Sequence, residues 1–201
     1  GRVNTHQKDN GVVRFSDVCR TNDVLILGKA RDFTVRQEHV RPLTYQYTDR
    51  LDAILQDLPK SPYGNIEQIV REAAFAYYVF ERIHPFPDGN GRIGRMVVNR
   101  IFRGAGLRDV IIFHDRKWYT KENSDHLEAM EKTDRAGDLS HLELYLLQVL
   151  KNNYPKQKDE PLSSEINNVI DKKRGDIRTS FGKRRLSDIW EGFTGIPMSG
   201  N

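Results

Sequence analysis

The residues best suited to chemistry lie in one unbroken block, HPFPDGNGRIGR, at positions 84–95. His84 is a candidate general base, because an imidazole gains and loses a proton near neutral pH. The glycines that follow it let successive backbone N–H groups face one concavity, and such a nest binds anions. A helix that begins just after them adds the positive end of its dipole. The block therefore predicts a site for phosphate oxygens next to a base.

Three charged side chains in the block fit that interpretation. Asp88 lies in the middle of the predicted phosphate site, where its natural role is to hold a Mg²⁺ ion that bridges phosphate oxygens. Arg92 and Arg95 lie three residues apart, so they project to the same side of a helix. The planar guanidinium fork suits phosphate oxygens better than lysine does. Together with His84, these residues predict transfer of a phosphoryl or nucleotidyl group to a hydroxyl.

Two strong helical patterns flank the block. Apolar residues recur every three or four positions over residues 66–83, which predicts a central, buried helix. Pro85 ends this helix, because a proline disfavours helical geometry at the residue before it. A second helical pattern follows Gly91 and ends at the glycines of 104–106. Residues 89–94 also read G-x-G-x-x-G, but that dinucleotide fingerprint needs a preceding strand, so we exclude a Rossmann fold.

The remaining segments predict a mainly α-helical fold with one small β element. Short strands are expected at 12–15 and 24–27, forming a β-hairpin flap within residues 11–40 that Arg41-Pro42 closes. The other expected helices are 43–58, 121–135, 139–152, 164–173 and 184–193. The polar, proline-bounded segment 153–163 reads as a linker. The predicted division is thus a core of residues 1–152, this linker, and a helical tail of residues 164–201.

Composition excludes several classes of protein. With 37% apolar residues over 201 positions, the chain can bury the core of one ordinary domain, so it is not a disordered protein. No apolar run approaches the ~18 residues of a membrane span and no leader-like segment lies near residue 1, so we expect a cytoplasmic protein without membrane contact. The single cysteine, Cys19, excludes an internal disulfide. A net charge of +4 permits a nucleotide ligand and does not by itself indicate nucleic-acid binding.

The block resembles the signature of Fic domains, H-P-F-x-[D/E]-G-N-G-R-x-x-R, at every fixed position. The resemblance extends roughly from Gly11 to Leu150. It implies a Fic-type helical core with a small β-hairpin flap, and a protein adenylyltransferase that moves AMP from ATP to a Ser, Thr or Tyr hydroxyl of a target protein. Relatives with altered signatures transfer phosphate, UMP or phosphocholine, and the intact Arg95 favours AMP. A non-catalytic Fic fold that binds a nucleotide or a partner protein stays open as the other class.

The resemblance also implies a role for each residue of the block. His84 would deprotonate the target hydroxyl, which then attacks the α-phosphate, while Asp88 would hold Mg²⁺ between the α- and β-phosphates. Arg92 would bind the β-phosphate and Arg95 the γ-phosphate. The ATP-binding anion hole would comprise Gly89, Asn90 and Gly91, with Phe86 as the buried anchor of the loop. The flap would pair with the target as an added strand and so place its hydroxyl.

A second motif lies near the C-terminus. Ser187, Glu191 and Gly192 fit S/T-x-x-x-E-[G/N], which resembles the inhibitory-helix motif of many Fic proteins. A glutamate that pairs with Arg95 would block productive placement of the γ-phosphate. The resemblance therefore implies an autoinhibited enzyme, and in some relatives the same glutamate supports removal of AMP. The expected partners are ATP, the target protein, the chain itself as a target of self-modification, and a second copy in a homo-oligomer.

Overall fold

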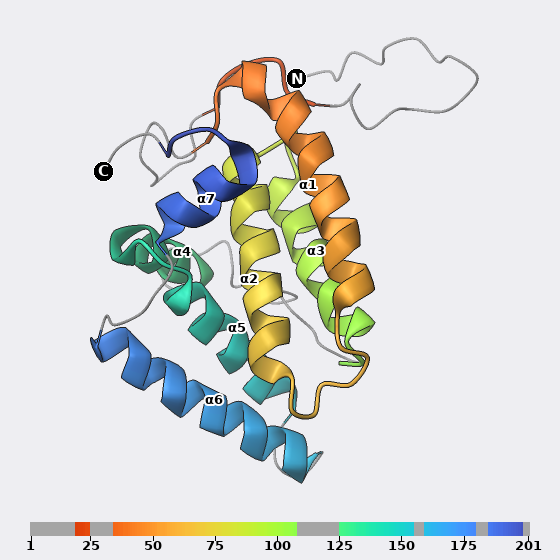
Figure 1. Ribbon diagram of the computed structural model, residues 1–201, viewed down its shortest axis with the longest axis vertical. Coiled ribbons are helices and arrows are strands. Elements are labelled where there is room, and N and C mark those ends of the chain that lie inside the picture. Colours follow the sequence, from red (N-terminus) through yellow and green to blue (C-terminus); the bar gives the residue numbers. More distant parts are fainter. Residues whose placement is uncertain (1–18, 25–33, 108–124, 155–158, 180–184, 199–201) are drawn as a thin grey trace, which may run out of the picture.

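The computed structural model describes residues 19–24, 34–107, 125–154, 159–179 and 185–198, and within them it contains seven helices and no β-strand (Figure 1). The helices are α1 (Gln37–Asp57), α2 (Ile66–Ile83), α3 (Asn90–Gly104), α4 (Asp125–Ala136), α5 (Ser140–Asn153), α6 (Glu160–Thr179) and α7 (Leu186–Thr194). The mainly helical prediction is therefore confirmed, and α2, α5 and α7 lie within two residues of their predicted bounds. The expected strand at 12–15 and residues 25–27 of the one expected at 24–27 lie outside the described residues, so the flap stays a prediction.

Helix α2 is the centre of the fold. Figure 1 shows α1 and α3 to one side of it, α5 and α6 to the other, and α7 crossing in front of its C-terminal half. Thirteen of its eighteen residues are buried, including every residue from Ala76 to Ile83. Because its neighbours cover this half on all sides, α2 is a core helix, and its C-terminal end is held where the motif begins.

Two apolar clusters hold the helices together. The larger one includes Tyr77 of α2, Phe102 of α3 and Leu146 of α5, and it extends into α4 and α6. The smaller one joins α1 to the C-terminal half of α2, and it also contains Phe86 of the motif and Trp190 of α7. The motif loop therefore rests on the smaller cluster. In the described part of the chain, no helix is both long and apolar enough to cross a membrane.

Helix α1 begins earlier than the sequence predicts. The expectation that Arg41-Pro42 closes the flap and that a helix starts at residue 43 is wrong, because α1 starts at Gln37 and contains Pro42. A proline there removes one N–H that would bond to a carbonyl one turn back. Val40 and Leu43, on either side of it, are 0% and 3% exposed. Burying such side chains contributes about 1.5–3 kcal/mol each, which offsets the missing bond.

Helix α6 is longer than predicted and starts within the segment that reads as a linker. It spans Glu160–Thr179 in place of the expected 164–173. Asp159 caps it, because the Leu162 N–H donates to Asp159 Oδ1 at 3.1 Å. Pro161 lies in the first turn, where a missing N–H breaks no helical bond. Leu162 is 2% exposed. The polar residues around position 159 are typical of a linker, yet a helix starts there because its first turn is capped and Leu162 is buried.

Candidate active site

His84 lies at the C-terminal end of α2, and its backbone turns the chain into the motif loop. Its N–H donates to the Phe80 carbonyl at 2.8 Å, and its φ and ψ of 46° and 60° are left-handed. It is the one non-glycine residue with a positive φ among those described. Such a conformation costs roughly 1–2 kcal/mol, so surrounding contacts must hold it.

Arg20 supplies those contacts from a distant part of the chain. Its Nε donates to the His84 carbonyl at 2.8 Å, its Nη2 donates to the Ile83 carbonyl at 3.3 Å, and its backbone N–H donates to the Pro85 carbonyl at 2.7 Å. The same guanidinium also bonds the carbonyls of Asn22 and Val35. Burial lowers the pKa of Arg20. A buried cation thus fixes the turn that carries the candidate base.

Sequence reasoning missed Arg20. It lies about sixty residues before the block and belongs to no recognisable motif. Only the folded chain brings its side chain, which is 3% exposed, against the end of α2. An isolated arginine after two apolar residues is the sole signal in the sequence, and that signal does not indicate what the arginine contacts.

The side chain of Asn90 closes the loop that follows His84. Its Oδ1 accepts the Phe86 N–H at 2.9 Å, and its Nδ2 donates to the Phe86 carbonyl at 2.7 Å. Asn90 is 2% exposed, and the Phe86 ring packs 6.3 Å from the Phe80 ring. The loop is therefore closed by one side chain and anchored by another. Asn90 also begins α3, so its own N–H and the next ones are free of helical carbonyls and available to an anion.

The aspartate and the first arginine of the block are exposed to solvent. The side chains of Asp88 and Arg92 are 94% and 69% exposed, and Asp88 Oδ2 lies 3.4 Å from Arg92 Nη2. The other Asp88 oxygen accepts the Gly89 N–H at 2.6 Å. Gly89 precedes α3 with a φ of 85°, a conformation that glycine adopts without strain. This end of the loop is accessible to a ligand and is held by few contacts.

Helices α2 and α3 approach closely just behind the loop. A β-carbon on Gly94 would lie 2.7 Å from the Tyr77 ring and 2.9 Å from Glu81 Oε1, so only glycine fits there. Arg95 is half-buried beside this contact, and its Nη1 lies 3.3 Å from where a β-carbon on Gly91 would be. The second arginine of the block therefore lies on the side of α3 that faces α2, whereas Arg92 faces solvent. The prediction that both project to the same side of the helix is wrong, because Arg95 packs toward α2 and Arg92 does not.

The comparison with known proteins agrees with this arrangement. Residues 13–102 match the model of the Fic/DOC family, and they include the whole of α2, the loop and most of α3. This segment, slightly less than half of the chain, is similar to the Fic/DOC family.

Among the relatives of this chain is a probable protein adenylyltransferase of Aquifex aeolicus, which is 45% identical over 51 residues, or 25% of this chain and 16% of the relative. The protein adenylyltransferase Fic of Culex quinquefasciatus is 42% identical over 67 residues, covering 32% of this chain and 12% of that protein. The corresponding protein of Nematostella vectensis is 37% identical over 83 residues, covering 41% and 19%. The matched part is thus less than a fifth of each relative. No solved structure matches the chain.

The C-terminal motif of the chain lies on α7. Trp190 is 2% exposed, with its ring 5.1 Å from the Arg82 guanidinium carbon, and Phe193 meets Phe75 edge-on at 5.9 Å. Both contacts fasten α7 to the helix that carries the candidate base. Ser187 is half-buried, whereas Glu191 and Gly192 are exposed. Within the described part of the chain, Glu191 forms no ion pair with Arg95.

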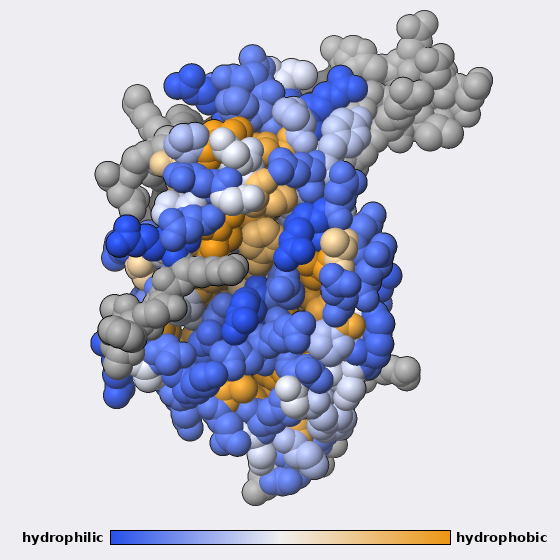
Figure 2. Space-filling view, viewed as in Figure 1, coloured by the Kyte–Doolittle hydropathy of each residue, from blue (hydrophilic) through white to orange (hydrophobic). Residues whose placement is uncertain are grey.

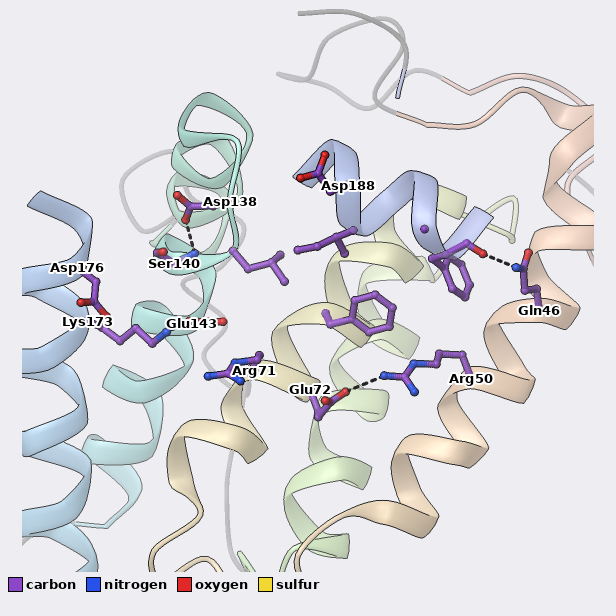
Figure 3. A pocket seen from close by; sticks show the side chains of 15 residues that line it. Gln46, Arg50, Arg71, Glu72, Asp138, Ser140, Glu143, Lys173, Asp176 and Asp188 are labelled. Atoms are coloured by element: carbon purple, nitrogen blue, oxygen red, sulfur yellow. Dashed lines mark hydrogen bonds and ion pairs between the residues drawn. The ribbon is translucent and has the colours of Figure 1, made fainter. Parts of the chain in front are cut away.

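A cavity of about 1040 Å³ lies on the face where α7 crosses α2, and residues 84–95 do not line it. Figure 2 shows apolar side chains on this face surrounded by charged ones, and Figure 3 shows that the cavity wall comes from α1, α2, α5, α6 and α7. Its charges pair with one another: Arg50 with Glu72 at 3.5 Å, and Lys173 with Glu143 at 2.5 Å. Gln46 donates to a backbone carbonyl of α7. The cavity therefore lies between helices and apart from the motif loop.

Proposed function

We propose that this chain is a protein adenylyltransferase, which transfers AMP from ATP to a Ser, Thr or Tyr hydroxyl of a target protein. One observation carries the proposal: His84 lies immediately before a loop that ends at the N-terminus of α3, and this helix places Arg92 and Arg95 in its first turns. A base, an anion-binding helix end and two guanidinium groups are the parts that nucleotidyl transfer needs. The names of the relatives, which are protein adenylyltransferases, support the same reaction.

In the proposed reaction, the target hydroxyl loses its proton to His84 Nε2 while its oxygen bonds the α-phosphorus of ATP. The bond between the α-phosphorus and its bridging oxygen breaks, and pyrophosphate leaves with that oxygen's electron pair. The proton on the imidazole then passes to solvent. Negative charge that grows on the phosphate oxygens is met by the N–H groups at the start of α3 and by the two arginines.

The residues present fit a Mg²⁺ ion bound together with ATP. No cluster of three or more acidic, histidine or cysteine side chains that could hold a metal occurs in the described ranges. Mg²⁺ is commonly held by one or two carboxylates, with phosphate oxygens and waters completing its shell. The exposed Asp88 is such a carboxylate at the mouth of the loop. When bound there, the ion would neutralise charge on the phosphates and orient them.

The same proposal includes regulation by the C-terminal helix. Helix α7 packs against α2 through Trp190 and Phe193, so it lies next to the helix that ends at His84. We propose that Glu191 restrains transfer and that the Glu191→Gly variant transfers AMP faster. Equal or slower transfer by that variant would mean that residues 187–192 form only a structural helix.

The decisive experiment is intact-protein mass spectrometry of the Glu191→Gly variant after incubation with ATP and Mg²⁺. Self-modification by the mass of one AMP is expected, and the matched variant that also carries His84→Ala is expected to show none. Labelling that persists in the double variant would contradict the role of His84. Incubation of the AMP-labelled variant with the wild-type chain, which keeps Glu191, and without ATP tests the reverse reaction, because loss of the label would show removal of AMP.

Two other outcomes distinguish the alternatives. A phosphate-sized mass shift, or a UMP-sized shift with UTP, would assign the chain to a different transfer reaction of the same fold. No shift, together with ATP binding that survives His84→Ala, would favour a non-catalytic nucleotide-binding module. A candidate target protein included in the same mixture tests transfer in trans, which the predicted flap within residues 11–40 would support by strand addition.

A further inference from the structure

Glu81 is a buried carboxylate that the proposed reaction does not yet use. It lies on α2 one turn before His84, and its side chain is 10% exposed. The other glutamates of α2, Glu67 and Glu72, are 28% and 26% exposed and pair with lysine or arginine at the surface. Taking a carboxylate out of water costs several kcal/mol unless partners compensate for it. Its burial therefore requires an explanation in terms of its neighbours.

Those neighbours belong to the candidate site. Glu81 Oε2 lies 3.5 Å from His84 Nδ1, while Oε1 is buried without a hydrogen-bond partner. On α3, a β-carbon added at Gly91 would lie 4.0 Å from Glu81 Oε1 and 3.3 Å from Arg95 Nη1. The carboxylate thus lies between the candidate base and the second arginine of the motif.

Two buried tyrosines face the same carboxylate. Burial raises the pKa of Tyr77, and the Glu81 charge raises it further while Arg95 opposes the rise. Burial also raises the pKa of Tyr47 of α1, again with Glu81 as the second cause. Both phenols therefore stay protonated, and neither competes with His84 as a base.

We propose that Glu81 is the positioning residue for His84: its carboxylate accepts the Nδ1–H of the imidazole and so directs the unprotonated Nε2 toward the target hydroxyl. This inference rests on the proposed function. An imidazole has one proton for two ring nitrogens, and a carboxylate on one side fixes which nitrogen holds it. The separation of 3.5 Å is long for a hydrogen bond, and contacts of this kind tighten when substrate binds.

The contact also accounts for the proton during transfer. When the hydroxyl proton reaches Nε2, the ring becomes an imidazolium with protons on both nitrogens. Its positive charge then faces the Glu81 carboxylate, and this contact stabilises the imidazolium. After pyrophosphate has left, the Nε2 proton passes to solvent and the Nδ1–H remains on Glu81. The carboxylate touches neither substrate nor the reacting atoms, so its whole effect passes through His84.

The test is ¹⁵N NMR of histidine-labelled protein at a pH where imidazoles are neutral. The chain has six histidines, and the His84 signals are assigned as those missing from a His84→Asn variant. The expected wild-type pattern is a protonated Nδ1 and an unprotonated Nε2. In a Glu81→Met variant, which keeps the side chain's length and removes its charge, the proton is expected to move to Nε2. A Glu72→Met variant, on the exposed side of the same helix, is expected to keep the wild-type pattern.

Activity gives the second readout. If AMP transfer is detected, kcat of the Glu81→Met variant is expected to fall by about 100-fold, while Glu72→Met stays near wild type. A wild-type chain with the proton on Nε2 overturns the proposal without any variant, and so does a Glu81→Met variant that keeps both the pattern and kcat. A wild-type chain with the expected pattern, combined with a Glu191→Gly variant that shows no transfer, would overturn the proposed function and leave the positioning contact in place.

Discussion

The two ends of the motif loop differ in how firmly they are held. At the His84 end, Arg20 and Asn90 bind backbone carbonyls and a backbone N–H, and both side chains are at most 3% exposed. At the other end, Asp88 and Arg92 are 94% and 69% exposed and are linked to each other at 3.4 Å. An exposed ion pair of this kind contributes 0–1 kcal/mol. One end is fixed before any ligand binds, whereas the other is open to solvent.

The difference fits the proposed reaction. A general base works only when its nitrogen already points at the proton, since misplacement of a catalytic group by even 1 Å is costly. A nucleotide and its metal arrive from solvent, so the groups that meet them must be accessible. Changes at the fixed end should therefore lower both stability and activity, whereas changes at the open end should lower activity alone.

The largest expected effect is the loss of the base itself. The His84→Asn variant should lose about 10²- to 10⁴-fold in transfer rate, because general base catalysis contributes that much. Asparagine tolerates the left-handed conformation at this position better than most residues do, so the thermal midpoint should stay close to wild type. The rate of AMP incorporation measures the loss of activity, and circular-dichroism melting measures the thermal midpoint. A variant that keeps its rate would contradict the role of His84.

The next largest effect should come from Arg20. An Arg20→Met variant leaves the carbonyls of Ile83 and His84 without their buried donor, which should cost about 2–4 kcal/mol in free energy of unfolding. Transfer should also slow, since the turn that carries His84 loses its support. Urea unfolding measures the first effect.

The matched control for Arg20 is Asp23→Asn, because Asp23 is 69% exposed and lies 3.9 Å from the Arg20 Nη1. It should change stability by less than about 0.5 kcal/mol. Equal losses in the two variants would show that the surface pair, and not the buried hydrogen bonds, holds the segment.

A smaller loss should follow from filling the gap between α2 and α3. A Gly94→Ala variant places a β-carbon 2.7 Å from the Tyr77 ring, and such overpacking costs about 1–3 kcal/mol. Gly104→Ala in the same helix is the control, because its nearest contact is 3.7 Å. It should be neutral or stabilising by up to about 1 kcal/mol, as alanine favours helix over glycine. The denaturant midpoints of the two variants measure these effects. A Gly94→Ala chain as stable as wild type would mean that α2 and α3 can move apart without loss of stability.

The smallest change in stability is expected at the open end. An Asp88→Ala variant should unfold within about 0.5 kcal/mol of wild type, because its carboxylate is exposed and its one ion pair is weak. Its transfer activity should nevertheless fall and should respond poorly to added Mg²⁺. Parallel urea curves and a Mg²⁺ titration of AMP incorporation test this. A destabilisation above about 1 kcal/mol would show that the Asp88 end of the loop also contributes to stability, so the two ends would not differ in this respect.

Local pattern was enough to predict the helices on either side of the loop. The apolar spacing over residues 66–83 matches α2, and Pro85 marks its end, because a helix cannot continue through that geometry. Gly89 and Asn90 supply the turn and helix start that the loop needs. The residue types of the block also indicated phosphate chemistry directly. These predictions rest on neighbours in the sequence, which interact in any fold.

What local pattern could not predict depends on contacts between distant segments. Pro42 reads as a break, yet it lies inside α1 because Val40 and Leu43 are buried against α2 and the motif. The start of α6 at residue 160 is masked by polar composition and is held by a capping aspartate and a buried leucine.

The sequence by itself determined which side chains could do chemistry and which helices present them. The tertiary structure alone decided how they are held: Arg20 reaches His84 across 64 residues, Glu81 turns inward to the site, and Glu191 points to solvent. The physical reason is that burial and long-range hydrogen bonds depend on the packing of whole helices. Residue type and spacing along one segment do not encode that packing.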